Sequence, residues 1–230
     1  MQTVDLKINS HHWRTHWRDE ADQSVFNEIF KLDEYRAAKE AIKNAKDPIV
    51  DVGAHAGFFT MYCRALNGRV KIFAIEPEAE NLRLLKQHLK ENRISGVKVV
   101  AGVLAEVSGK RRLLLSADSH NHQLLSEADS NENSIPVKSF AFSDFCRQNK
   151  IKKVSLLKID IEGGEYEVFA GMSAPDLSMV NFVILEYHGS KRREEIADKL
   201  RVAGFGVQIF PSHFDKTMGF IWANNKRIKL

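Results

Sequence analysis

The sequence predicts an α/β domain in which a mostly parallel β-sheet carries helices on both faces. Short apolar runs alternate with amphipathic, helix-like segments almost to the end of the chain. One early run passes through two glycines into a helix-like segment, and two later runs end in charged residues, as strands do where ligands bind. The chain has 230 residues, of which 43% are hydrophobic, and no Pro-, Gly- or Ser-rich linker divides it. We therefore expect one core domain.

Composition restricts the classes of function. The formal net charge is +4, but the basic residues are scattered rather than gathered in a stripe, so no nucleic-acid partner is expected. The two cysteines, Cys63 and Cys146, are isolated and lack metal-binding spacing, which fits a reducing, cytoplasmic location. No apolar run reaches the length of a membrane span.

Residues 1–46 are expected to form an N-terminal helical extension or lid. His12 and His16 stand four residues apart, as zinc ligands on a helix can, but no third ligand is apparent nearby. The segment 11–18 also repeats an aromatic–basic pair, and a surface helix held by its two tryptophans accounts for the same residues; a lid or substrate contact is the other functional interpretation. Apolar residues in the segment 25–46 recur at helical spacing and predict one or two amphipathic helices before the first strand. The main domain is expected over residues 47–223, and residues 224–230 form a basic tail.

Within the main domain, changes of hydrophobic period mark the elements. The first strand begins at Ile49, and the helix after it spans 58–66 and ends at a typical stop, Asn67-Gly68. Other strands are predicted at 70–75, at 97–102, from 154 onward and at 180–188. The last two strands, 205–210 and 218–223, are expected to form an antiparallel hairpin. Other helices are predicted at 78–92, at 142–149, from 165 onward and at 191–203. Strands 110–115 and 134–140 are predicted to pair. The polar insertion 116–133 between them is expected to be a functional loop over the substrate pocket.

The most informative stretch runs from Asp51 to Thr60, Asp-Val-Gly-Ala-His-Ala-Gly-Phe-Phe-Thr. It reads as a buried strand, a tight loop with Gly53 and Gly57, and a helix whose first backbone N–H groups have no intrahelical partner. Because the glycines carry no side chain, a flat or anionic ligand group can approach the main chain closely. This pattern indicates a nucleotide-type cofactor site.

Two residues discriminate between cofactors. In the dinucleotide fingerprint G-x-G-x-x-G/A the middle glycine makes room for a pyrophosphate, but here His55 takes its place. Glu76 ends the next apolar run, where an acid can accept hydrogen bonds from a ribose diol. S-adenosylmethionine (SAM) has the ribose and no phosphate, so the sequence favours SAM over a nicotinamide dinucleotide. A nicotinamide-dependent oxidoreductase is the alternative enzyme.

Charged residues also end two later strands. Lys158, Asp160 and Glu162 alternate with apolar residues, so the three side chains share one side if the strand continues to Glu162. His188 ends the strand 180–188. Charges at such an edge are costly to bury unless they have a function or pair with one another. Asp160, Glu162 and His188 are therefore candidates for catalysis, and Lys158 is expected to offset the acids; simple pairing of Lys158 with the acids at the sheet edge is the alternative. No metal ligands are predicted, because no histidine stands beside these acids in the sequence.

The motifs resemble those of the FkbM-type SAM-dependent methyltransferases over about residues 20–223. The resemblance rests on the loop 51–57, on Glu-Pro-Glu-Ala-Glu-Asn at 76–81, on Leu-Leu-Lys-Ile-Asp-Ile-Glu-Gly at 156–163 followed by Glu165-Tyr166, and on Ile-Leu-Glu-Tyr-His at 184–188. His55 stands where the family commonly has Asn. The resemblance implies a Rossmann-like, seven-stranded sheet of the class I methyltransferase type with an antiparallel last strand. It also implies methyl transfer to a hydroxyl oxygen of a sugar, polyketide or similar small acceptor.

The candidate residues form a cofactor set and a catalytic set. The cofactor-binding residues are expected to be Asp51, Gly53, Ala54, His55, Gly57, Phe58, Phe59 and Thr60 around the methionine part, Glu76, Pro77 and Asn81 at the ribose, and Val103 and Leu104 at the adenine. Because a neutral hydroxyl is a poor nucleophile, a base should remove its proton. Asp160 and Glu162 are expected near the methyl group and the acceptor, and His188 is a second candidate base. The non-enzymatic alternative is a SAM- or nucleotide-binding module without catalysis.

Overall fold

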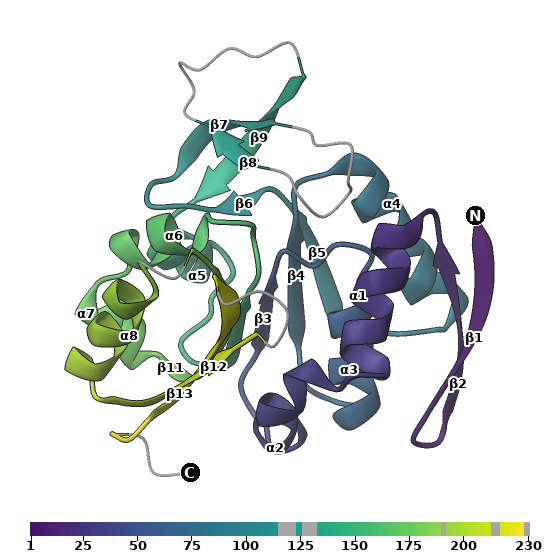
Figure 1. Cartoon of the computed structure of the whole chain (residues 1–230), viewed down its shortest axis with the longest axis horizontal. Helices are drawn as coiled ribbons and strands as arrows, with labels where there is room; N and C mark the ends of the chain where they lie inside the picture. The colour runs from purple at the N-terminus through teal and green to yellow at the C-terminus, as the bar shows by residue number, and fades with distance from the viewer. Residues whose placement is uncertain (115–122, 126–132, 190–191, 213–216, 228–230) are drawn as a thin grey trace.

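Seven strands form the central sheet, in the order β12–β13–β11–β10–β3–β4–β5 (Figure 1). The computed structural model describes residues 1–114, 123–125, 133–189, 192–212 and 217–227. The strands are β3 (Ile49–Val52), β4 (Ile72–Glu76), β5 (Val97–Ala101), β10 (Val154–Ile159), β11 (Val180–His188), β12 (Phe205–Pro211) and β13 (Met218–Asn225). β13 runs antiparallel to β11 and to β12, while β11, β10, β3, β4 and β5 pair in parallel. The predicted sheet, with its antiparallel last strand, is confirmed.

Helices cover both faces of this sheet. One face carries α1 (Glu20–Phe30), the 3-10 helix η1 (Glu34–Ala38), α2 (Lys39–Lys43), α3 (Phe58–Leu66) and α4 (Ala79–Glu91); the other carries α5 (Phe142–Gln148), α6 (Glu165–Gly171), α7 (Ala174–Ser178) and α8 (Arg193–Val202). Residues of β3 point to both faces of the sheet. Ile49 packs in the cluster that contains α1 and α3, while Val50 and Val52 pack in the cluster that contains α5, α6 and α8. Among the described residues, none of the helices combines the length and apolar character needed to cross a bilayer.

The N-terminal 17 residues form a β-hairpin, and the prediction of a helix for this segment is wrong. β1 (Gln2–Ile8) pairs antiparallel with β2 (His11–Trp17), which lies against α4 and α1 at one side of the molecule (Figure 1). The reason is a period of two: Trp13, Thr15 and Trp17 all point inward and are buried. Residues of α1, η1 and α2 confirm the helices expected between 25 and 46.

A second, smaller sheet stands at the edge of the first (Figure 1). It contains β6 (Val103–Leu104), β9 (Ser134–Phe140), β7 (Gly109–Leu114) and β8 (Gln123–Leu125). The antiparallel pairing of β7 with β9 confirms the predicted partners. Within the polar insertion 116–133, residues 123–125 form β8 against β7, which was not expected; most of the remaining insertion, and the tail beyond Arg227, lie outside the described residues.

Candidate active site

A cavity opens at the carboxyl ends of β3, β4, β10 and β11, where parallel sheets bind ligands. Its walls come from the glycine loop after β3, from the ends of β4 and β10, from α1 and η1, and from the smaller sheet. The lining residues are Val25, Glu28, Ile29, Tyr35, Val52, Gly53, Ala54, His55, Phe59, Ile75, Glu76, Pro77, Asn81, Gly102, Val103, Leu104, Leu113, Leu124, Lys158, Asp160, Ile161, Glu162, Gly164, Glu186 and Met218. Segments far apart in the sequence therefore share one site.

Close backbone approach explains Gly53. Its φ of 75° lies in the left-handed region, and a Cβ atom on it would stand 1.8 Å from the carbonyl oxygen of Asp160. Any other residue would push the loop away from the end of β10. His55, at φ 49°, takes up the same left-handed conformation without being glycine, so its backbone N–H is turned toward Glu76.

Glu76 ends β4 as a buried carboxylate held by three donors. The backbone N–H of His55 donates to its Oε2 at 2.8 Å, while the backbone N–H of Glu78 and the side-chain amide of Asn81 donate to Oε1 at 3.0 and 3.2 Å. Burial raises the pKa of Glu76, and these hydrogen bonds partly offset that increase. A carboxylate offers about four acceptor positions, so capacity remains for a ligand hydroxyl.

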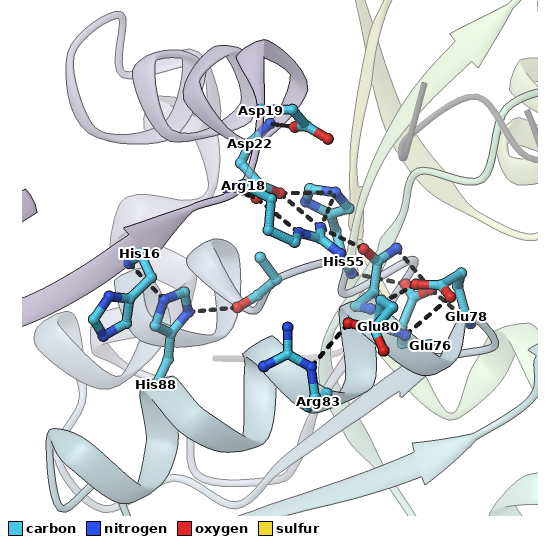
Figure 2. Close-up of polar contacts among 12 residues, drawn as sticks. His16, Arg18, Asp19, Asp22, His55, Glu76, Glu78, Glu80, Arg83 and His88 are labelled. Carbon is cyan, nitrogen blue, oxygen red and sulfur yellow. Dashed lines mark hydrogen bonds and ion pairs between the residues drawn. The ribbon is translucent and has the colours of Figure 1, made fainter. Parts of the chain in front are cut away.

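A chain of contacts connects Glu76 to the N-terminal segment, as Figure 2 shows. Arg18, which follows β2, donates to Asn81 Oδ1 at 2.6 Å and forms an ion pair with the fully buried Asp22 of α1. The same Asp22 carboxylate lies 3.4 Å from His55 Nε2. The hairpin and α1 thus brace the residues that orient Glu76.

Lys158 joins the glycine loop to the end of β10. Its buried ammonium donates to the carbonyl of Gly53 at 2.8 Å and lies 3.4 Å from both the Asp51 and the Asp160 carboxylates. Although burial opposes it, the two carboxylates raise the pKa of Lys158, so the side chain stays charged. Burial raises the pKa of Asp51, against the effect of Lys158 and of the hydroxyl of Thr60, which donates to it at 2.7 Å.

The end of β10 differs in one respect from the sequence prediction. The strand ends at Ile159, and Glu162 lies in the turn before α6 at a φ of 51°, so the strand alternation does not carry Glu162 to the side of Lys158 and Asp160. The hydroxyl of Tyr35 donates to Asp160 at 3.4 Å. Burial is the main cause that raises the pKa of Glu162 to about 7.

His188 at the end of β11 is a charged neighbour of these acids. Its Nδ1 lies 2.8 Å from Oε1 of the fully buried Glu165, and its Nε2 lies 3.4 Å from Oε2 of Glu162. Burial lowers the pKa of His188, but the hydrogen bond to Glu165 and the surrounding carboxylates outweigh it and raise the pKa to about 9. Burial and then Asp160 raise the pKa of Glu186, two residues earlier, well above its usual range.

Comparison with known proteins identifies the family. The sequence profile described as "Methyltransferase FkbM domain" matches residues 51–227. The chain belongs to the FkbM methyltransferase family. It is 26% identical to the hexuronic acid methyltransferase AglP of Haloferax volcanii, over 81% of this chain and 77% of that one, and 24% identical to the 31-O-demethyl-FK506 methyltransferase FkbM of Streptomyces tacrolimicus, over 70% and 73%.

Solved structures agree with this membership at the level of the fold. The METTL16 MTase domain superposes with a TM-score of 0.55 at 13% identity, covering 95% of this chain and 85% of that chain. The protein is thus a methyltransferase with the class I, Rossmann-like fold, and family and fold imply that it uses SAM. The oxidoreductase and the non-catalytic module, the alternatives left open by the sequence, do not fit this membership.

The methyltransferase cavity gathers most, but not all, of the candidate residues. Gly53, Ala54, His55, Phe59, Glu76, Pro77, Asn81, Val103, Leu104, Asp160 and Glu162 line it, whereas Asp51, Gly57, Phe58, Thr60 and His188 do not. Phe58 instead packs edge-on against Phe26 and beside His88. Thr60 holds Asp51 behind the loop. Phe58, Thr60 and Asp51 thus support the shape of the glycine loop from within the core.

Several lining residues had no signal in the sequence of this methyltransferase. Glu28 and Tyr35 reach the cavity from α1 and η1, because these helices pack across the carboxyl ends of the strands. Glu186 stands in an informative motif but was not assigned a role. Lys158, which was expected to offset the acids, also donates to the carbonyl of Gly53. Arg18 lies next to the two tryptophans, and only the fold brings it to Asn81.

Proposed function

We propose that this methyltransferase transfers the methyl group of SAM to a hydroxyl oxygen of a sugar or similar natural-product acceptor. One observation carries the proposal. A single cavity is lined by Glu76 on the β4 side and by Asp160, Glu162 and Glu186 on the side of β10 and β11. The carboxylate proposed to bind the ribose, Glu76, and the group proposed as the base, Glu162, thus face the same space.

The β3–β4 side of the cavity fits SAM. Glu76 has acceptor capacity left for ribose hydroxyls, and three fixed donors hold its carboxylate in place. Gly53 lets the cofactor's methionine part approach the main chain, and Val103 and Leu104 offer apolar contacts to the adenine. His55 occupies the position that a pyrophosphate needs, which supports a cofactor without phosphates.

The β10–β11 side fits an acceptor rich in hydroxyl groups. Glu28, Asp160, Glu162 and Glu186 line this part of the cavity, and carboxylates accept hydrogen bonds from hydroxyls. The names of two relatives, a hexuronic acid methyltransferase and a 31-O-demethyl-FK506 methyltransferase, support a sugar or natural-product hydroxyl.

The chemistry requires alignment and removal of one proton. SAM supplies an activated methyl group when bound, and the methyl carbon leaves sulfur as it bonds to the acceptor oxygen. Positioning by the walls of the cavity can contribute about 7–11 kcal/mol to such a step. Glu162 accepts the hydroxyl proton, since a base works best with a pKa near the operating pH and the pKa of Glu162 is about 7. His188, with a pKa of about 9, carries its proton already and is the poorer base.

Calorimetry and a turnover assay test the proposal. SAM and S-adenosylhomocysteine should bind to the purified protein, and NAD should not. A panel of sugars, uronic acids and polyketides should then yield S-adenosylhomocysteine together with an acceptor that has gained one methyl group in mass spectrometry. Binding of NAD in preference to SAM would overturn the cofactor assignment, and methylation at nitrogen only would overturn the hydroxyl acceptor.

A further inference from the structure

Three potential metal ligands meet at the edge of the sheet although they are apart in the sequence. Asp160 follows β10, while Glu186 and His188 stand two residues apart on β11 and so share one side of that strand. β10 and β11 are parallel neighbours, with Ile159 opposite Leu185, which places Asp160 level with Glu186. One ligand atom from each of the three side chains lies within 4.8 Å of those of the other two. A single ion can therefore reach all three.

The surroundings of His188 provide an independent indication. The carboxylate of Glu165, which is fully buried, lies 2.8 Å from Nδ1 and fixes the orientation of the ring. Nε2 is buried and has no hydrogen-bond partner among the described residues, although Glu162 Oε2 lies 3.4 Å away without hydrogen-bonding geometry. A carboxylate behind one ring nitrogen is typical of metal-binding histidines, and a metal ion at Nε2 would take the place of the proton that His188 otherwise carries.

Acidic side chains gather around the three proposed ligands. Glu28, Glu162 and Glu186 line the same cavity as Asp160, and no residue in the described part of the chain donates a hydrogen bond to Glu186. The neighbouring Lys158 already donates a hydrogen bond to the Gly53 carbonyl and forms ion pairs with the Asp51 and Asp160 carboxylates. A cation between Asp160 and Glu186 would be attracted by the carboxyl groups on both sides.

We propose that Asp160, Glu186 and His188 bind a divalent metal ion on the acceptor side of the cavity. Two carboxylate oxygens and one imidazole nitrogen suit a first-row ion such as Mn²⁺ better than Ca²⁺, which prefers oxygen ligands. Three protein ligands leave coordination positions open to acceptor oxygens, and the ion would lower the pKa of a bound hydroxyl before Glu162 accepts its proton. This role rests on the proposed function, whereas metal binding itself does not.

Mn²⁺ titration without SAM or acceptor tests the site directly. The metal-free full-length protein should take up one Mn²⁺, read as loss of the free-ion signal in electron paramagnetic resonance, and pulsed spectra should show nitrogen hyperfine coupling. Glu186→Gln and His188→Gln should each weaken binding by roughly tenfold or more, and His188→Gln should also abolish the nitrogen coupling. Glu28→Gln is the matched control, because it removes the same charge from the same cavity without removing a ligand; affinity should stay nearly unchanged.

Three results would overturn the metal site. The first two are no stoichiometric Mn²⁺ uptake and no nitrogen coupling in the unmodified protein. The third is an equal loss of Mn²⁺ affinity in Glu28→Gln and Glu186→Gln, which would indicate that the cavity attracts the ion by its overall negative charge and not by specific ligands. Thermal unfolding of each variant verifies that it is folded. SAM affinity, measured by calorimetry on the metal-free protein, separates this proposal from the proposed function. Mn²⁺ binding without SAM binding contradicts only the proposed function, and SAM binding without Mn²⁺ binding contradicts only the metal site.

Discussion

His88 of α4 should make the stability of this methyltransferase sensitive to mild acid. The ring is fully buried, with Nε2 accepting the backbone N–H of His16 and Nδ1 2.8 Å from the carbonyl oxygen of Ala56 in the glycine loop (Figure 2). Because Nε2 accepts, Nδ1 carries the single proton and the ring is neutral. A second proton on Nε2 would face the N–H of His16 and break the link between β2 and α4.

The size of this loss of stability follows from the pKa of His88. Burial is the main cause that lowers the pKa of His88 from 6.5 to about 4. Between these values the unfolded chain binds the proton and the folded protein does not, so the free energy of unfolding falls as the pH is lowered. At about 1.4 kcal/mol for each pH unit between the two pKa values, the full penalty is about 3 kcal/mol. About 2 kcal/mol of it should be present at about pH 5.

Urea unfolding across this range, followed by circular dichroism, measures the effect. His88→Gln keeps a polar side chain that does not titrate, so the variant should start less stable but lose about 2 kcal/mol less than the unmodified protein on going to about pH 5. Other groups titrate equally in both proteins and cancel in the difference. His12→Gln, at an exposed position of the same hairpin, should follow the unmodified protein. A constant difference between His88→Gln and the unmodified protein at every pH would refute the reasoning.

Three further substitutions test the site. Glu76→Ala should weaken SAM binding by about 1.5–3 kcal/mol in calorimetry, the scale of hydrogen bonds to a charged group. An unchanged affinity would show that Glu76 does not bind the ribose. Glu162→Gln should lower turnover at least roughly hundredfold while SAM affinity changes little, because it removes the base that accepts the hydroxyl proton; normal turnover contradicts this role of Glu162. Gly53→Ala should prevent stable folding in thermal denaturation, because its Cβ would stand 1.8 Å from the Asp160 carbonyl, whereas Gly68→Ala, with nothing within 4 Å, should be tolerated.

The sequence predicts those parts of the site that depend on local order. Gly53 and Asp160 follow apolar strands and Glu76 ends one, and the carboxyl ends of parallel strands meet at one edge of the sheet. Their convergence follows from the fold class alone. The same rule places His188 at that edge, although its contact with Glu165 depends on how α6 packs.

What the sequence does not predict depends on long-range packing. Glu28 reaches the cavity only because α1 crosses the strand ends, and Arg18 meets Asn81 only because the hairpin lies beside α4. The hairpin itself carries a local signal, the alternation of Trp13, Thr15 and Trp17, but the spacing of the histidines suggested a helix instead. β10 ends at Ile159 because the chain turns through Glu162. Glu162 has a left-handed φ, which a glutamate at this position does not predict.

The contact between Gly53 and the carbonyl of Asp160 determines where the enzyme can open. Two motifs more than a hundred residues apart touch main chain to main chain, and Lys158 fastens them further through the Gly53 carbonyl. We therefore expect the glycine loop and the end of β10 to move together as the floor of the cavity. We expect a bound cofactor to exchange past the walls instead, where Glu28 and Tyr35 line the cavity from α1 and η1, and Leu113 and Leu124 line it from the smaller sheet. A rigid floor would keep the groups that line it at fixed distances while the surrounding segments admit and release ligands.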